Sequence, residues 1–301
     1  IYNLNYIRKI LGNNLIADLK RVVIFEKLIQ PKLNDILLAA ARDIFTQMKV
    51  LLNYAVKLDY IETNPLSSFT INDINLPNGV VREGFETVGK ERNRVLTEGE
   101  LKIVLSDVYA AKIYLPIKIA IHLLLMLGCR KGELLNIKWS DIDFEQSLLS
   151  MSIDKVSKPL TTKIPSQALL LFKILQVVNG SKEYVFCMPS KKTRMAYTIL
   201  NKWLTVLFVE SKKLTQNLTV HDLRRTFATN LADLDYDRSH IEFQLGHSLS
   251  GSQKHYYHAE FLEQRGIMLQ FWADKLDSYI PLEFHPYNKN YTRSAVCLKN
   301  E

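Results

Sequence analysis

The chain has 301 residues, of which 47% are hydrophobic, so it can bury two separate cores and we expect two domains. Lysine and arginine outnumber aspartate and glutamate by 39 to 31, and the formal net charge of +8 favours an anionic partner such as nucleic acid. The three cysteines are widely spaced and odd in number, which argues against a disulfide framework or a zinc site and favours a reducing cytoplasm. The most apolar stretch, residues 117–129, is shorter than the roughly 18 residues of a membrane span, so it predicts a buried core helix and argues against a membrane protein.

A helical first domain is expected over residues 1–75. Between residues 35 and 58 apolar side chains recur at three- and four-residue steps, which predicts one long amphipathic helix; they are Leu37, Ala41, Ile44, Met48, Leu51 and Ala55. Asn34 and Asp35 are expected to cap the start of this helix. Pro65 closes the segment, because a proline restrains the residue before it.

A shorter helix is expected upstream, over residues 21–29, with Gly12 and Pro31 as the breaks on either side. The chain begins at Ile1 rather than Met and shows no signal peptide, which is typical of a fragment of a longer protein.

A linker is expected over residues 76–94, where helical periodicity stops and several glycine and proline residues collect. Thr97 and Glu100 then have the spacing of a capping box, in which each side chain binds a backbone N–H at the start of a helix. We therefore predict a helix that begins near Glu98 and a second domain over residues 95–276.

The second domain is predicted to be mainly helical with a small β-sheet or hairpin. Residues 148–153 and 161–164 are rich in β-formers and flank a turn with Pro159, which predicts the hairpin. After Asp274 the sequence has little periodicity. We expect a tail over residues 277–301 that is disordered or packs on a neighbouring subunit.

A glycine and an arginine follow the apolar helix directly. Gly128 can close that helix and project Arg130 from its end, a position suited to binding an anion. An isolated arginine at such a position is more often solvated or ion-paired. Further on, His221 and Arg224 are three residues apart, so on a helix both can contact one phosphate. His247 follows a glycine, and Tyr256 comes nine positions later.

Four separated segments together resemble one protein family. They are LGCRKGELLNIKWSDID, HDLRRTFAT, LGHS and YYHAEFLEQRGIMLQFWADKL, and in this order and spacing they look like the catalytic domain of the tyrosine recombinases, nearest to prophage and genomic-island integrases. The long helix that ends YAVKLDYIETNPL resembles the core-DNA-binding domain of the same family. The resemblance covers roughly residues 1–276 and implies a helical core-DNA-binding domain followed by a mixed α+β catalytic domain.

The resemblance implies a role for each matching residue. Arg130 and Arg224 would hold the non-bridging oxygens of the scissile phosphate, His221 and His247 would complete the pocket, and Glu133 would orient the site through Arg130. Planar guanidinium groups match phosphate oxygens in pairs, so two arginines can replace a metal ion. A phenol has a pKa near 10 and needs a base or a positive field, and His221 is the candidate base.

The nucleophile is expected to be Tyr256. The family pattern Ala-Glu-aromatic-Leu-Glu-Gln-Arg occurs here as residues 259–265 and aligns Tyr256 with the reactive tyrosine, with Tyr257 as the alternative.

The resemblance also implies a lysine in the hairpin that protonates the leaving 5′ oxygen. The hairpin is one residue shorter than the common pattern when counted back from Pro165, and Lys158 fits best, with Lys155 and Lys163 as rivals. Each of these lysines could instead be a plain phosphate contact.

No metal or other cofactor is expected. His240, His247, His255 and His258 lie close in sequence but lack a zinc-binding spacing, and the chain has no glycine-rich phosphate loop, so ATP is not implied.

The resemblance implies double-stranded attachment-site DNA as the partner, a homotetramer on that DNA, accessory DNA-bending proteins, and a bacterial, nucleoid-associated location. Two rival interpretations remain open. One is a type IB topoisomerase, and the other is a degenerate integrase that only binds DNA as a regulator.

Overall fold

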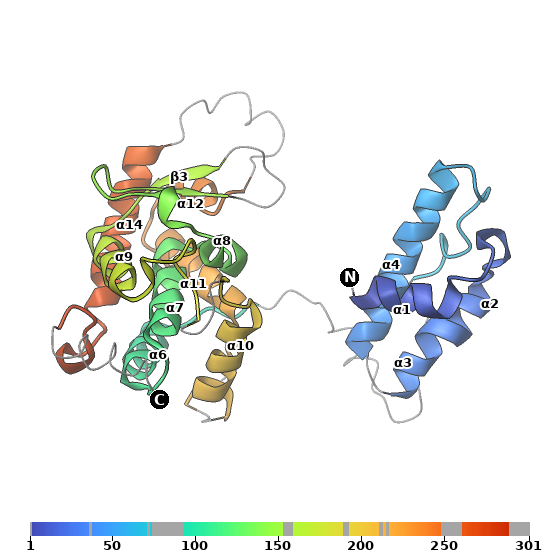
Figure 1. Ribbon diagram of the computed structural model, residues 1–301, viewed down its shortest axis with the longest axis horizontal. Helices are drawn as coiled ribbons and strands as arrows, with labels where there is room; N and C mark the ends of the chain where they lie inside the picture. Colours follow the sequence, from blue (N-terminus) through green and yellow to red (C-terminus); the bar gives the residue numbers. More distant parts are fainter. Residues whose placement is uncertain are drawn as a thin grey trace. The chain divides into compact units, whose positions relative to one another are not determined.

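The computed structural model describes residues 2–35, 38–70, 73, 93–152, 159–188, 193–210, 213–214, 217–247 and 261–288. The chain divides into two compact units, Ile1–Arg92 and Asn93–Glu301 (Figure 1). Each unit has its own hydrophobic core. Within the described residues, no helix is long and apolar enough to cross a membrane.

The first unit is helical. Its helices are α1 (Tyr2–Leu11), α2 (Arg21–Ile24), α3 (Gln30–Asn34) and α4 (Leu38–Lys57). A π-helical turn, Phe25–Ile29, joins α2 to α3, so the predicted short helix is part of a longer helical run. The core lies between α1, this run and α4; its fully buried members include Leu28, Ile29, Leu33, Ala41 and Leu52.

The predicted long amphipathic helix is confirmed as α4. Four of its six predicted core positions are buried: Ala41, Ile44, Met48 and Ala55. Leu51 is exposed, and its neighbour Leu52 is buried instead, so the prediction for Leu51 was wrong; Leu37 lies outside the described residues. The predicted cap Asn34 was wrong, because it is the last residue of α3; Asp35 is the C-cap of α3, and residues 36–37, which lead to α4, lie outside the described part.

Pro31 does not break the helical run. It lies at the start of α3, where a missing backbone N–H costs little, because the first N–H groups of a helical segment lack partners within it. The π-helical turn immediately before it changes the hydrogen-bonding register, so the chain continues past the proline without a loop. The local rule that proline ends a helix was therefore wrong here.

The second unit is built from eight helices among its described residues, with a small sheet at one side (Figure 1). The helices are α6 (Glu98–Ala110), α7 (Leu115–Leu127), α8 (Lys131–Leu135), α9 (Ser166–Asn179), α10 (Thr198–Leu204), α11 (Val220–Asp233), α12 (Arg238–Gln244) and α14 (Leu262–Asp277). The mainly helical fold with a small β-sheet is thus confirmed.

The sheet has three antiparallel strands in sequence order, β1 (Ile142–Asp143), β2 (Leu148–Met151) and β3 (Leu160–Lys163). In the predicted hairpin, Leu148 of β2 pairs with Lys163 of β3, and Met151 pairs with Leu160. The strand β1 was missed, because two residues are too few to show an alternating pattern. Residues 153–158, which join β2 to β3, lie outside the described part of the chain.

Every residue of α7 is buried, as the apolar sequence predicted, including the two polar ones. Lys118 Nζ donates to the backbone oxygen of Tyr109 at 2.8 Å, and His122 Nδ1 lies 2.9 Å from the Tyr109 hydroxyl. Burial lowers the pKa of Lys118 to about 8 and that of His122 to about 3. On its other side, α7 accepts a 2.8 Å hydrogen bond at the Leu125 oxygen from Trp272 of α14. The helix α7 is therefore fixed on both sides by hydrogen bonds, and it fixes the start of the loop that follows it.

The capping box at the start of α6 is confirmed, with Thr97 as N-cap and Glu100 as its partner. Arg94, which the sequence placed in the linker, is largely buried and pairs with the same Glu100. The entry segment is further fixed by Leu96, whose N–H donates to Thr226 Oγ1 of α11 at 3.0 Å.

Gly128 ends α7 in the left-handed region with a φ of 65°, as predicted. A Cβ atom at this position would lie 2.3 Å from Cδ1 of Phe227 on α11. We expect Gly128→Ala to lower the free energy of unfolding by about 2 to 5 kcal/mol, since the left-handed backbone costs about 1 to 2 kcal/mol and the crowded ring about 1 to 3 kcal/mol. Urea unfolding measures this change. The control is Gly99→Ala in α6, where an added Cβ meets no atom within 4 Å and should be neutral or slightly stabilising. Equal stability of the two variants would contradict the account.

The segment after Asp274 packs on its own unit as far as it is described. Lys275 to Asp277 complete α14, and Tyr279 and Ile280 are buried. The Tyr287 hydroxyl donates to the backbone oxygen of Gln167 at 3.0 Å. Up to Asn288 the expectation of a disordered tail was wrong, and packing on a neighbouring subunit stays a prediction; residues 289–301 lie outside the described part.

Candidate active site

Arg130 lies in the two-residue turn between Gly128 and α8. Its backbone N–H donates to Glu133 Oε2 at 2.6 Å, and its Nη1 donates to Glu133 Oε1 at 2.7 Å. Glu133 therefore caps the start of α8 and holds the guanidinium at the same time. The Glu133 side chain is 5% exposed and that of Arg130 is 41% exposed, so the arginine offers its remaining donors to solvent.

The second arginine comes from α11. This helix begins with a capping box in which Asp222 Oδ2 accepts from the N–H and the hydroxyl of Thr219, both at 2.8 Å. The cap fixes the first turn, so that His221 and Arg224 lie one turn apart on the same helix. The segment is helical, which is the condition under which both side chains can contact one phosphate.

Arg224 is buried and connects three parts of the unit. Its Nη1 donates to the Gly128 oxygen at 3.0 Å, and its Nη2 donates to the Leu245 oxygen at 2.6 Å. Nη1 also lies 3.8 Å from Glu133 Oε2, so one carboxylate faces both arginines. Burial, and next the charge of Arg130, lower the pKa of Arg224 to about 10, which still leaves a cation at neutral pH.

His247 follows α12 and lies directly against Arg224. Its Nε2 is 2.8 Å from Arg224 Nη2, and its Nδ1 is 2.5 Å from Glu242 Oε2. The imidazole is thus held between a cation and a carboxylate. Glu242 was not identified from the sequence, and the only available signal was an acidic residue five positions before the histidine.

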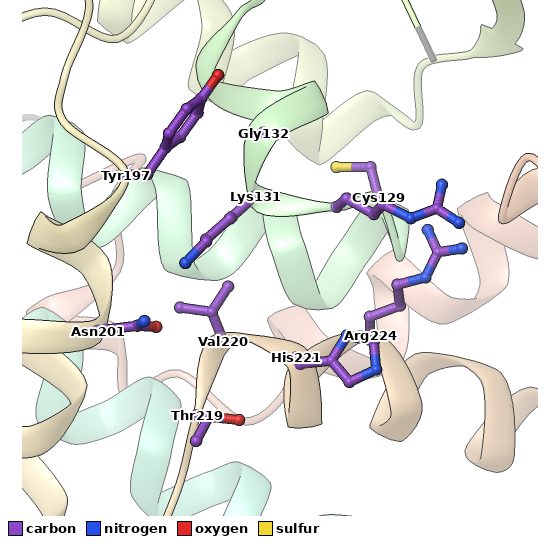
Figure 2. Close-up of a pocket in the computed structure, with 10 residues that line it drawn as sticks. Cys129, Lys131, Gly132, Tyr197, Asn201, Thr219, Val220, His221 and Arg224 are labelled. Carbon is purple, nitrogen blue, oxygen red and sulfur yellow. The ribbon is translucent and has the colours of Figure 1, made fainter. Parts of the chain in front are cut away.

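His221, Arg130 and Arg224 line a cavity of about 410 Å³. Its other walls come from α10 and from the residues around the starts of α8 and α11; they are Cys129, Lys131, Gly132, Tyr197, Asn201, Thr219 and Val220 (Figure 2). In the figure, the Lys131 amine is directed towards Asn201 and Val220 across this space. Partial burial, followed by the charges of Arg225 and Arg224, lowers the pKa of His221, which favours the neutral imidazole that can accept a proton.

A buried polar cluster lies behind the site and was not foreseen. Gln244 Nε2 donates to the Leu127 oxygen at 3.1 Å, and Gln244 Oε1 accepts from Thr162 of β3 at 2.9 Å and from Arg265 of α14 at 3.0 Å. Arg265 also donates to the Thr161 oxygen at 2.8 Å and is fully buried. We call Gln244, Thr162 and Arg265 the Gln244 cluster. It ties β3, α12 and α14 to the end of α7, just before Gly128.

The structure thus brings together Arg130, Glu133, His221, Arg224 and His247, from three separate stretches of sequence. Tyr256, its alternative Tyr257, Lys158 and its rival Lys155 lie outside the described residues. The other rival, Lys163, is in β3 and forms an ion pair with Glu263 at the start of α14.

The chemistry of the arrangement is suited to binding one anion. Two guanidinium groups converge next to two imidazoles, and a single buried carboxylate holds both cations without neutralising them fully. Such a set of donors stabilises negative charge that spreads over phosphate oxygens. In the described part of the chain, no group of three or more acidic, histidine or cysteine side chains is placed to hold a metal ion.

Comparison with known proteins agrees with this geometry. The model of the phage integrase family matches residues 94–263, which is more than half of the chain. The chain belongs to the phage integrase family.

Two relatives illustrate the match, one along most of this chain and the other along about half of it. The integrase of Enterobacteria phage P4 is 24% identical over 307 residues, which cover 95% of this chain and 64% of that protein. A tyrosine recombinase, XerA, of Pyrococcus furiosus is 30% identical over 168 residues, 55% of this chain and 58% of the relative. The chain therefore spans less than two thirds of the length of these relatives.

Solved structures share the fold. A structure of the Tn1549 transposon integrase in complex with a circular intermediate DNA has a TM-score of 0.61 at 18% identity and covers 85% of this chain and 88% of its own. A lambda integrase dimer bound to a core site has a TM-score of 0.58 at 17% identity; the match covers 82% of this chain and 86% of the lambda integrase chain.

Proposed function

We propose that this protein is a site-specific tyrosine recombinase. It would cut and rejoin DNA strands through a covalent 3′-phosphotyrosine on Tyr256, and so integrate or excise a prophage or genomic island. The observation that carries the proposal is the convergence of Arg130, His221 and Arg224 on one pocket, with His247 held against Arg224. Membership of the phage integrase family supports it.

The pocket suits phosphoryl transfer from DNA. The Tyr256 oxygen attacks the scissile phosphorus while its proton passes to the neutral imidazole of His221. As the new P–O bond forms, the bond from phosphorus to the 5′ oxygen breaks, and Arg130 and Arg224 stabilise the charge on the non-bridging oxygens. The leaving 5′ oxygen takes a proton from Lys158. Reversal with a different 5′ hydroxyl rejoins the strands, so the phosphotyrosine conserves the bond energy and no ATP is consumed.

The proposed partner is double-stranded DNA, with the first unit as the core-DNA-binding domain and residues 95–276 as the catalytic domain. Phosphate contacts would supply most of the affinity, and a minority of base contacts the specificity. The structures of related folds include a lambda integrase tetramer bound to a Holliday junction, which supports a homotetramer here. Accessory DNA-bending proteins, a role for residues 289–301 on a neighbouring subunit, and a place with the bacterial nucleoid in the cytoplasm belong to the same proposal.

Trapping the covalent intermediate tests the function. A candidate attachment-site duplex with a nick just 3′ of the cleavage position loses its short 5′-hydroxyl fragment by diffusion, so the cut strand stays attached to the protein. We expect a protein–DNA band that survives a denaturing gel and disappears after protease treatment. A regulator that only binds DNA would give no such band. A type IB topoisomerase would give the band and would also relax supercoiled plasmids that lack an attachment site.

Lys158 is expected to act as the general acid. Lys158→Ala should cleave ordinary DNA about 10² to 10⁴ times more slowly at saturating protein, because a general acid contributes a factor of that size. A substrate with sulfur at the 5′ bridging position should recover most of the lost rate, because a thiolate leaves with little need for a proton. Single-turnover cleavage of the two substrates measures both effects.

Lys155→Ala is the matched control for Lys158→Ala. It should show neither the slow cleavage nor the rescue, and at most weaker binding with a flatter salt dependence. Rescue of Lys155→Ala but not of Lys158→Ala would move the assignment by three residues.

A further inference from the structure

The contacts of His247 define which of its ring nitrogens carries a proton. Arginine can only donate hydrogen bonds, so Nε2, at 2.8 Å from Arg224 Nη2, must be an acceptor. The proton of a neutral ring is then on Nδ1, where it is donated to Glu242 Oε2 at 2.5 Å. Glu242 thus selects one of the two neutral forms of His247 and fixes the orientation of the ring.

The backbone holds Glu242 close to the His247 ring. It lies on α12, only five residues before His247, and the turn between them is closed by a hydrogen bond from the His247 N–H to the Glu242 backbone oxygen at 3.1 Å. The Glu242 charge also acts on Arg224, since it raises the pKa of that guanidinium against the lowering effect of burial. One carboxylate therefore acts on two members of the candidate site without lining the cavity.

We propose that Glu242 is a positioning residue for strand cleavage, a role that rests on the proposed recombinase function. By accepting the Nδ1 proton, it keeps Nε2 of His247 directed at Arg224. His247 is thereby held against Arg224, so the two side chains keep one arrangement beside the pocket. Without Glu242 the ring is free to turn and to place its single proton on Nε2, against the donor Nη2 of Arg224.

The first test is spectroscopic and needs no DNA. In ¹⁵N-labelled protein at alkaline pH, the His247 ring should show a protonated Nδ1 and an unprotonated Nε2, with the signal assigned by its loss in His247→Gln. Glu242→Ala should move the ring towards the Nε2-protonated form, and Glu242→Gln should keep Nδ1 protonated, because a carboxamide oxygen still accepts. An Nε2-protonated ring in the unaltered protein would overturn the proposal, whatever reaction the protein catalyses.

The second test separates positioning from a general structural role. At saturating protein, Glu242→Ala should slow adduct formation by about 10- to 100-fold, the usual effect of losing a group that orients a functional histidine, and Glu242→Gln should regain part of that loss. If Glu242 acts through His247, the same substitution should cost less than about threefold in a His247→Ala background.

The matched control is Glu283→Ala, which removes an exposed carboxylate from the segment Leu282–Phe284 and should leave the rate unchanged. Losses that multiply in the Glu242→Ala, His247→Ala double variant would overturn the proposal, as would a Glu242→Ala variant as fast as the Glu283→Ala control. A complete lack of adduct from the unaltered protein would instead refute the recombinase function and leave the NMR test to decide the role of Glu242.

Discussion

Tyr256→Phe should abolish the covalent protein–DNA adduct while leaving DNA binding within about twofold. The substitution removes only the phenolic oxygen, which is the atom expected to attack phosphorus, and it keeps the aromatic ring. Cleavage should therefore fall below detection rather than by a fixed factor. The measurement pairs a denaturing gel of nicked attachment-site DNA with a native gel-shift titration of the same DNA.

Tyr257→Phe is the matched control for the nucleophile, because it removes the same atom one position later. We expect it to form adduct at a rate within a few-fold of the unaltered protein. The reverse pattern, with adduct from Tyr256→Phe and none from Tyr257→Phe, would shift the nucleophile by one residue. Adduct from both variants would contradict a phosphotyrosine at either position.

Arg224→Lys should slow cleavage by about 10³-fold or more, since an arginine that stabilises a phosphoryl transition state contributes a factor of this size. The Arg224 guanidinium already donates to the Gly128 and Leu245 oxygens and still faces the pocket. A lysine keeps the charge but has one compact donor group, so it cannot serve two carbonyls and a phosphate in one plane. Single-turnover adduct formation at saturating protein measures the effect.

Arg225→Lys is the control for this variant, because it makes the same chemical change at the next residue of α11. We expect it to cleave within a few-fold of the unaltered protein. Since Arg224 also holds two loops together, a thermal melt of both variants must show that they are folded. Cleavage by folded Arg224→Lys within tenfold of the unaltered rate would remove Arg224 from the centre of the site.

Features that depend on a few neighbouring residues could be predicted from the sequence. The capping box of Thr97 and Glu100, the buried helix α7 and its end at Gly128 all follow from local hydrogen bonding, burial or backbone freedom. Arg130 was found because it follows Gly128 closely, and His221 and Arg224 because they are three residues apart. Their convergence in space followed from the family resemblance.

Contacts between distant segments could not be predicted. The Gln244 cluster joins residues 82 and 117 positions apart in the sequence, and a glutamine next to a leucine carries no sign of such partners. The contact of Glu242 with His247 could not be predicted either, because it depends on how α12 packs against α11. Local rules also failed where packing decided the outcome, as at Pro31, inside a helical run, and at Leu51, which is exposed beside the buried Leu52.

The Gln244 cluster also determines which segments of the second unit must separate together in local unfolding. The hairpin whose connecting residues include Lys158 would be expected to detach easily from a globular core, since among the described strands β3 pairs with β2 alone. Here, peeling β3 away would separate the fully buried Arg265 guanidinium from the Thr161 oxygen and Gln244 from Thr162. Arg265 left buried without these partners would cost several kcal/mol, so the three segments separate more readily together than one at a time. We therefore expect the amide hydrogens of β3, α12 and the first turns of α14 to exchange with solvent together, as one cooperative unit, in an opening that also separates the residues around Arg130 and Arg224.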